Sequence, residues 1–126
     1  MEQVRLTPED EERLAQCIRR QWTDAHGVSP GAVHVLADAH CIVAWIEEVL
    51  SPAERAMLGW QQGQELLRRY TDQLLVTIRP ALRSEVEAVT GRKSLTDSLW
   101  ADPASQRIMC VYQLGLPIVT QSDHRL

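Results

Sequence analysis

The sequence contains no phenylalanine, and it carries no recognisable signature of catalysis or of nucleotide binding. A Gly-x-Ser-x-Gly nucleophile motif is absent, and Gly59-x-x-x-Gly63 lacks the lysine of a phosphate-binding loop and lies inside a helical pattern. Without a nucleophile, a base and an orienting group in a known pattern, we expect no enzymatic activity and no cofactor. The aromatic residues include four tryptophans, namely Trp22, Trp45, Trp60 and Trp100.

Export and membrane-spanning signals are missing as well. The N-terminal residues have neither the basic nor the apolar region of a signal peptide. The three cysteines, Cys17, Cys41 and Cys110, form no Cys-x-x-Cys pair, which is typical of a reducing compartment. The longest uncharged stretch, 108–122, is broken by polar residues, glycine and proline and is shorter than the ~20 apolar residues of a membrane helix. We therefore expect a cytoplasmic protein that reaches a membrane only through a partner.

The charge balance weighs against a nucleic-acid partner. Thirteen basic residues are set against seventeen acidic ones, for a net charge of −4, whereas nucleic-acid binders normally carry a basic excess or stripe. A hydrophobic content of 44% over 126 residues is typical of one soluble domain. We expect a single domain over residues 1–126, with its core at about 7–114 and a C-terminal tail at 115–126.

Two helical regions are marked by capping residues. Thr7 and Pro8 begin the first helix and Gly27 ends it, with an apolar stripe made of Leu14, Cys17, Ile18 and Trp22. Ser51, Pro52 and Glu54 form the capping box of a second helical region that reaches about Thr90. We expect Gly59 and Gly63 to divide that region into a short helix and a long one.

The long helix carries an apolar stripe and a proline. The stripe comprises Leu67, Tyr70, Leu74, Ile78, Leu82, Val86 and Val89, which recur at steps of three and four. Pro80 predicts a kink near 76–79, because it cannot donate a hydrogen bond one turn back. Gly91 ends the helix, and Arg92 and Lys93 suit the negative end of its dipole.

Two pairs of β-strands are expected between and after the helices. The runs 33–37 and 40–49 form one hairpin around Asp38-Ala39, and 94–101 and 107–114 form another around residues 102–105. The order α-ββ-αα-ββ predicts an α+β fold of two layers, with an antiparallel sheet of about four strands and helices packed on one face.

Both faces of the first hairpin are apolar, so the sheet is expected to need cover on two sides. With Ala37 placed opposite His40, one face carries Val33, Val35, Ile42, Ala44 and Ile46, and the other carries His34, Leu36, Cys41, Val43 and Trp45. A face that no helix of the chain covers would bury against another subunit or a partner. We expect a homodimer, formed through the long helix or through the sheet.

The long stripe offers a second candidate contact. A strand of six residues spans only about 20 Å, so a helical stripe of about 34 Å would extend beyond the sheet and contact a partner. The expected interaction surface consists of Trp45, Trp60, Leu66, Leu67, Tyr70, Leu74, Ile78 and Arg79.

A metal site is a weaker interpretation. Imidazole, thiolate and carboxylate groups occur at His26, His34, Asp38, His40 and Cys41, but His34 and His40 are expected on opposite faces, and no Cys-x-x-Cys or His-x-x-x-His spacing is present. We expect no bound metal. Two alternative functions remain open: a small-molecule or anion-sensing domain with a pocket at His34, Trp45 and Arg79, and a metal-dependent enzyme built on the histidines of the first hairpin.

Several short motifs follow one another along the chain in a distinctive order. They are Val33-His34-Val35, Ile42-Val43, Val49-Leu50-Ser51-Pro52-Ala53-Glu54, Gly63, Glu65-Leu66, Arg79-Pro80, Leu82 and Thr90-Gly91-Arg92-Lys93. In this order and spacing, residues of about 31–114 resemble the MpsC family of small bacterial proteins. The family is named after a sodium-translocating, membrane-potential-generating system, whose other members are membrane proteins associated with uptake of bicarbonate or carbon dioxide. The resemblance implies a cytoplasmic accessory protein that acts with such membrane transport proteins and supplies no catalytic residues.

Overall fold

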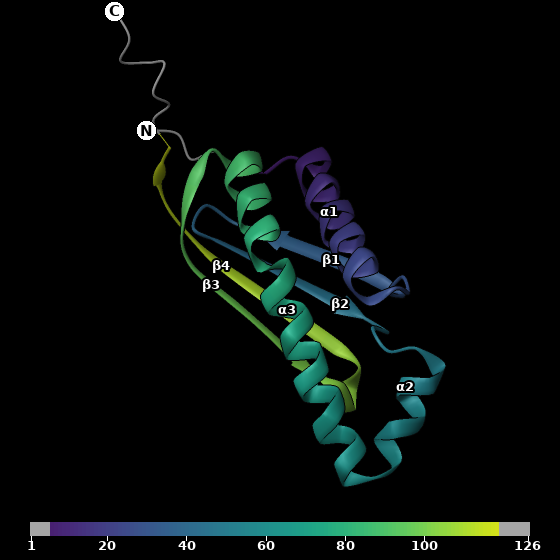
Figure 1. The fold of residues 1–126 in the computed structure, drawn as a ribbon. Helices are drawn as coiled ribbons and strands as arrows, with labels where there is room; N and C mark the ends of the chain where they lie inside the picture. The colour runs from purple at the N-terminus through teal and green to yellow at the C-terminus, as the bar shows by residue number, and fades with distance from the viewer. Residues whose placement is uncertain (1–5, 119–126) are drawn as a thin grey trace, which may run out of the picture.

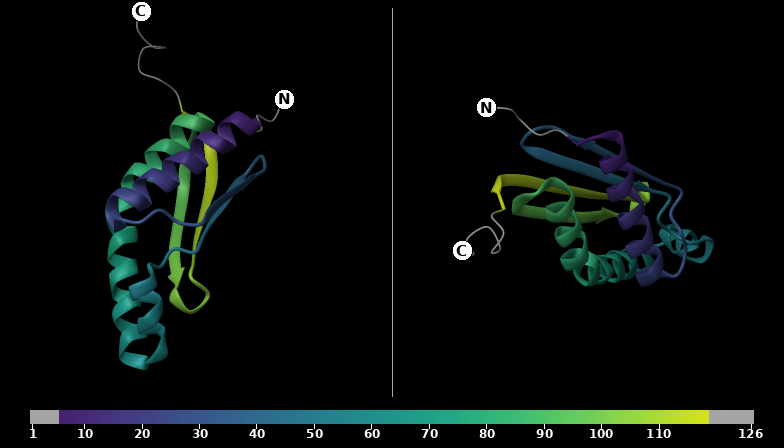
Figure 2. Two further views of the ribbon diagram at one scale, coloured as in Figure 1. Left: turned by 90° about the vertical axis from the view of Figure 1, so that its right-hand side faces the viewer. Right: turned by 90° about the horizontal axis from the view of Figure 1, so that it is seen from above.

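The computed structural model describes residues 6–118, which form a two-layer α+β fold (Figure 1). Its elements are α1 (Pro8–His26), β1 (Ala32–Ala37), β2 (Cys41–Glu47), α2 (Pro52–Ala56), the 3-10 helix η1 (Met57–Gly59), α3 (Gln61–Thr90), β3 (Arg92–Asp102), the 3-10 helix η2 (Pro103–Ser105) and β4 (Arg107–Pro117). The two long helices, α1 and α3, lie on one side of the antiparallel sheet (Figure 2). The predicted fold class is confirmed.

The first helix forms as its end signals predict. The Thr7 side chain accepts a hydrogen bond from the backbone N–H of Asp10, and the Asp10 carboxylate accepts one from the backbone N–H of Thr7. Gly27 ends the helix at φ 96°, in the left-handed region that glycine enters without steric cost. The predicted stripe is buried, so α1 packs its apolar side against β1 and α3.

The four strands follow the order β1-β2-β4-β3, so the two hairpins meet through β2 and β4. In the first hairpin Ala37 pairs with Ile42, not with His40 as expected. The carboxylate of Asp38 accepts hydrogen bonds from the backbone of His40 and Cys41, which widens the turn by two residues. A shift of two residues leaves every side chain on its predicted face, because side chains in a strand alternate with a period of two.

The second helical region divides at Gly59, as expected, whereas Gly63 does not interrupt it and lies inside α3. Ser51 and Glu54 close the capping box of α2, and η1 then turns the chain into α3, whose 30 residues run without interruption through Pro80. The two halves of α3 point in different directions in both views of Figure 2, as a proline inside a helix predicts.

The buried side of α3 differs from the predicted stripe at three positions. The buried residues are Gly63, Leu67, Thr71, Leu75, Ile78, Leu82 and Val86. Thr71 and Leu75 thus occupy places assigned to Tyr70 and Leu74, and Val89 is only partly buried. Thr71 is tolerated in the core because its hydroxyl donates to the carbonyl of Leu67, 2.8 Å away.

The second hairpin is longer than predicted. β3 and β4 have 11 residues each, which corresponds to about 36 Å at about 3.3 Å per residue. The strands are thus longer than the six residues assumed, yet the first turns of α3 still extend past the tip of this hairpin, beside α2 (Figures 1 and 2). β4 also runs to Pro117, past the predicted end of the core at 114, and residues 119–126 of the expected tail lie outside the described residues.

Candidate interaction surfaces

The sheet has one face covered by α1 and α3 and one face that no helix of the described residues covers (Figure 2). We call the uncovered side the open face. Its central side chains, identified by strand pairing and alternation, are His34, Leu36, Cys41, Val43, Trp45, Thr96, Ser98, Trp100, Met109, Val111 and Gln113. The apolar second face predicted for the first hairpin thus continues onto β4 through Met109 and Val111 and reaches Trp100 on β3.

On β2, β4 and β3, the larger side chains of the open face lie in one row and the smaller ones in the row beside it. The tryptophan row runs across the strands as His34, Trp45, Met109 and Trp100, and the valine row runs beside it as Leu36, Val43, Val111 and Ser98. Leu36 is 62% exposed and Trp100 is 46% exposed. The rings of His34 and Trp45 stack with their centroids 4.9 Å apart. The open face is therefore a ridge of large side chains beside a shallower strip.

A group of charged side chains lies at one end of the open face. The carboxylate of Glu47 lies 2.7 Å from Nε2 of His34 and 3.6 Å from the guanidinium of Arg107. Asp102 is the neighbour of Arg107 on β3. The opposite end carries the uncharged side chains of Cys41, Gln113 and Thr96.

A second exposed apolar strip follows α3, and we call it the helical strip. Leu66, Tyr70 and Leu74 succeed one another at steps of four, which places them on one side of the helix. Leu66 is 55% exposed, Tyr70 is exposed, and Leu74 is partly buried. Trp60 is 51% exposed at the start of the helix, where its indole approaches Gly63.

Three residues of the predicted interaction surface lie elsewhere. Leu67 and Ile78 belong to the core, where each is 2% exposed, so no partner reaches them. Arg79 is half-buried, and its Nε has no hydrogen-bond partner among the described residues. The stripe was correct as a helical pattern, but its centre faces the sheet of the same chain. Trp45, Trp60, Leu66, Tyr70 and Leu74 are divided between the open face and the helical strip.

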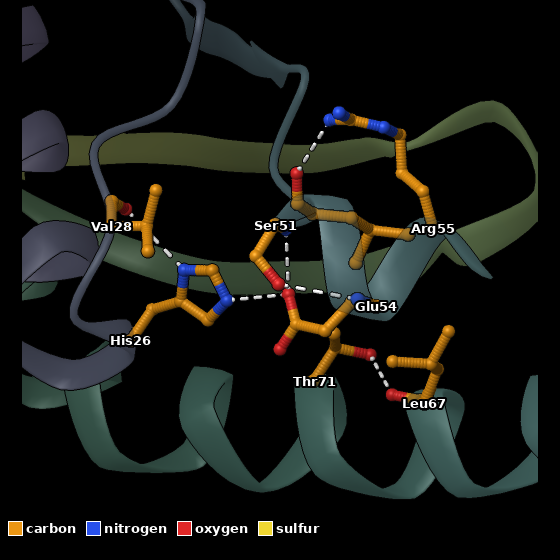
Figure 3. A network of polar contacts seen from close by, with 8 residues as sticks. His26, Val28, Ser51, Glu54, Arg55, Leu67 and Thr71 are labelled. Atoms are coloured by element: carbon orange, nitrogen blue, oxygen red, sulfur yellow. Dashed lines mark hydrogen bonds and ion pairs between the residues drawn. The ribbon is translucent and has the colours of Figure 1, made fainter. Parts of the chain in front are cut away.

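A polar junction joins the end of α1 to the start of α2, close to α3 (Figure 3). The Nε2 atom of His26 lies 2.8 Å from the carboxylate of Glu54, which also accepts a hydrogen bond from the backbone of Ser51 at 2.8 Å. The Nδ1 atom of His26 lies 3.3 Å from the carbonyl oxygen of Val28. Burial favours a raised pKa for Glu54, but the hydrogen bonds from Ser51 and His26 outweigh it, so its pKa lies below the ordinary value.

Aromatic rings complete this junction. Trp22 stacks on His26 with a centroid distance of 5.0 Å, and Tyr70 of the helical strip lies 6.1 Å from His26 on a tilted plane. Burial, followed by the charge of Glu54, raises the pKa of Tyr70. The junction therefore holds Tyr70 of α3 against His26 of α1, which is itself bonded to Glu54 of α2. The capping box at Ser51 was the only part of this junction that the sequence indicated.

Little in the described part of the chain suggests metal binding or a reactive nucleophile. No three His, Cys, Asp or Glu side chains of residues 6–118 lie together as a metal site requires. His34 is on the open face, His40 is in the hairpin turn, and His26 is in the helical layer. Burial raises the pKa of all three cysteine thiols, that of Cys110 to about 12, so the reactive thiolate is suppressed.

The predicted pocket at His34, Trp45 and Arg79 does not form. His34 and Trp45 lie on the open face, while Arg79 belongs to α3 on the covered side of the sheet. A cavity bounded by α1, α3 and the sheet measures about 10 Å³, which is the space of one water molecule. A shallow groove of about 290 Å³ follows the edge of β1 beside α1 and includes His34 and Trp45 in its wall.

The comparison with known families decides the identity. A family model described as the Na+-translocating membrane potential-generating system (MpsC) matches residues 8–113. The chain belongs to the MpsC family. No curated protein and no solved structure matches it. The match begins in α1 of this MpsC protein, earlier than the motifs that suggested the family.

The helices of the MpsC chain were compared with the requirements of a membrane span. Within residues 6–118, no helix combines the length and the apolar character that crossing a membrane requires.

The sequence did not predict that Trp100 and Met109 belong to the open face, because only the pairing of β4 with β2 and β3 places them beside Trp45. The alternation of residues 107–113 was the signal that could have found Met109.

Proposed function

We propose that this protein is a non-catalytic accessory component of a membrane ion or inorganic-carbon (bicarbonate) uptake system. It acts from the cytoplasm and binds a membrane transport protein of that system. The name of the family supports the link to a membrane-potential-generating system. The observation that carries the binding role is the helical strip, whose apolar side chains Leu66 and Tyr70 are exposed on a helix that packs its other side into the fold.

The side chains of the strip are suited to a protein partner. Tyrosine and tryptophan are enriched at the centres of protein interfaces, where they bury a large area at a small cost in conformational entropy. Leu66 and Tyr70 are spaced as the anchors of a helix that lies in an apolar groove. The junction at His26 holds Tyr70 in place before binding, which lowers the entropy lost on association.

The charges beside the strip favour a protein over a lipid surface. Arg68 and Arg69 are flanked by Glu65 and Asp72, so the local charge is balanced. Binding to an anionic membrane surface relies on a cluster of basic residues. The net charge of −4 for the whole chain also disfavours binding to an anionic membrane surface.

The test is recovery of a membrane protein from the native cell. Tagged wild-type protein is purified after detergent extraction, beside Leu66→Glu in the strip and Val76→Glu as a matched control. Val76 is 58% exposed on α3 at a position outside the strip. We expect a transport protein to be recovered with the wild type and with Val76→Glu, and to be lost with Leu66→Glu. Equal recovery with all three proteins, or recovery with none, would refute the proposal.

A further inference from the structure

The open face of the sheet is a different surface from the helical strip, and its pattern points to a specific occupant. We propose that it packs against the open face of a second copy of this chain, related by a two-fold axis that runs across the strands between the tryptophan row and the valine row. This inference is independent of the membrane partner, because it concerns the other side of the sheet.

The two rows are complementary in shape under this symmetry. A two-fold axis between them places the tryptophan row of one copy over the valine row of the other, and the reverse. Trp45 then lies over Val43 of the second copy, Met109 over Val111, and Trp100 over Ser98. Sheets that pack face to face lie about 10 Å apart with interdigitated side chains, so large residues over small ones fill this space.

The alternative two-fold axis, parallel to the strands, fits less well. It would place the tryptophan row on the tryptophan row and the valine row on the valine row. The first contact would hold the sheets apart, and the second would then leave an unfilled gap. The distribution of side-chain size therefore selects the axis across the strands.

Charge and area agree with the same arrangement. The axis places Glu47 and Arg107 of one copy over Cys41 and Gln113 of the other, so neither charged side chain faces its own counterpart. Four strands about 4.8 Å apart and four outward rows about 6.8 Å apart give a face of about 19 by 27 Å. Two such faces bury about 1,000 Å² in projection, which is the size at which specific interfaces begin.

The first test is the mass of the purified full chain in solution. We expect about twice the 14.3 kDa of one chain at about 100 μM protein, by sedimentation equilibrium or light scattering. Val111→Glu and Met109→Lys, each on the open face, are expected to give the mass of one chain with an unchanged circular dichroism spectrum. The control Val76→Glu stays a dimer. A monomeric wild type, or a dimeric Val111→Glu, overturns the proposal.

A mixture of the two variants tests the position of the axis. Residues 109 and 111 face each other across the proposed interface, so mixed Val111→Glu and Met109→Lys place opposite charges together. We expect the mixture to regain the dimeric mass that each variant loses alone. With the axis parallel to the strands, positions 109 and 111 never meet, so a mixture that stays monomeric overturns the proposed arrangement. No membrane protein is present in these experiments. Failure of the dimer proposal is therefore separate from failure of the proposed binding to a transport protein.

Discussion

His26 and Arg92 each join parts of the chain that are distant in the sequence. His26 ties the end of α1 to the start of α2 through Glu54. Arg92 was assigned only to the dipole at the end of α3, but its guanidinium donates to the carbonyl oxygens of Ala39 and of Gly115, the latter at 2.7 Å. It therefore holds the turn of the first hairpin against the end of β4. Single polar side chains thus connect elements within each layer.

Replacement of Glu54 by glutamine is expected to destabilise the fold in a pH-dependent way. The pKa of Glu54 is lowered in the folded protein, so its carboxylate adds stability that is present above pH 4.5 and lost as the pH falls through the folded pKa. We expect Glu54→Gln to cost about 1–2 kcal/mol near neutral pH, since it weakens two charge-assisted hydrogen bonds.

Urea denaturation of both proteins from pH 7 to pH 3 measures this effect. The difference in unfolding free energy should shrink as the pH falls below 4.5. The exposed Glu65, changed to glutamine, is the control and should change stability by less than about 0.5 kcal/mol. A difference that stays constant across the pH range would contradict the assignment.

The role of Arg92 is tested by Arg92→Ala against its exposed neighbour Lys93→Ala. Loss of the guanidinium leaves partly buried carbonyl groups without a donor, so we expect Arg92→Ala to lower the unfolding free energy by about 2 kcal/mol. Lys93→Ala should change it by less than about 0.5 kcal/mol. Chemical denaturation measures both. Equal effects would mean that only the helix dipole matters at these two positions.

Among the elements, the corner between η1 and α3 depends on a glycine. A Cβ atom at Gly63 would collide with the carbonyl oxygen of Met57 and approach the indole of Trp60 to 2.9 Å. Gly63→Ala should therefore separate η1 from α3 and lower the unfolding free energy by about 2 kcal/mol.

Gly59→Ala is the matched control, since a Cβ atom there meets nothing within 4 Å. We expect its midpoint of thermal unfolding to match that of the wild type, while the midpoint of Gly63→Ala falls. A Gly63→Ala protein as stable as the wild type would show that the close approach at Met57 relaxes freely.

The ends of the helices were predictable from sequence because their causes are local. Thr7, Gly27, Ser51 and Gly91 act on backbone groups within four residues, so each signal was complete in a short stretch of chain. The buried side of α3 was less predictable. A hydropathy pattern counts Thr71 as polar, yet Thr71 is buried because its hydroxyl donates a hydrogen bond to the carbonyl oxygen of Leu67 in the same helix.

Features that depend on strand pairing could not be predicted from the sequence. The register of the first hairpin depends on where the Asp38 side chain finds its donors. Trp45 was correctly placed on the second face because alternation is local, whereas Trp100 joins it only through the order β2-β4-β3. The expected interaction surface therefore had the right residue types, but its division into two surfaces required the tertiary structure.

For the whole molecule, the two surfaces lie in different layers. The open face belongs to the sheet, and the helical strip belongs to α3 on the other side. A dimer formed through the sheets leaves the strip of each copy uncovered. Under the two proposals, a pair of copies presents two identical helical strips to a membrane transport protein.

The measurement that tests this central claim most directly is recovery of two differently tagged copies from the native cell. The first tag is used for purification after detergent extraction, and the second tag and the transport protein are then detected. Wild type should recover both, Leu66→Glu only the second copy, and Val111→Glu the transport protein without the second copy. If both variants lose the same component, or neither loses any, the account of two surfaces with two occupants is wrong.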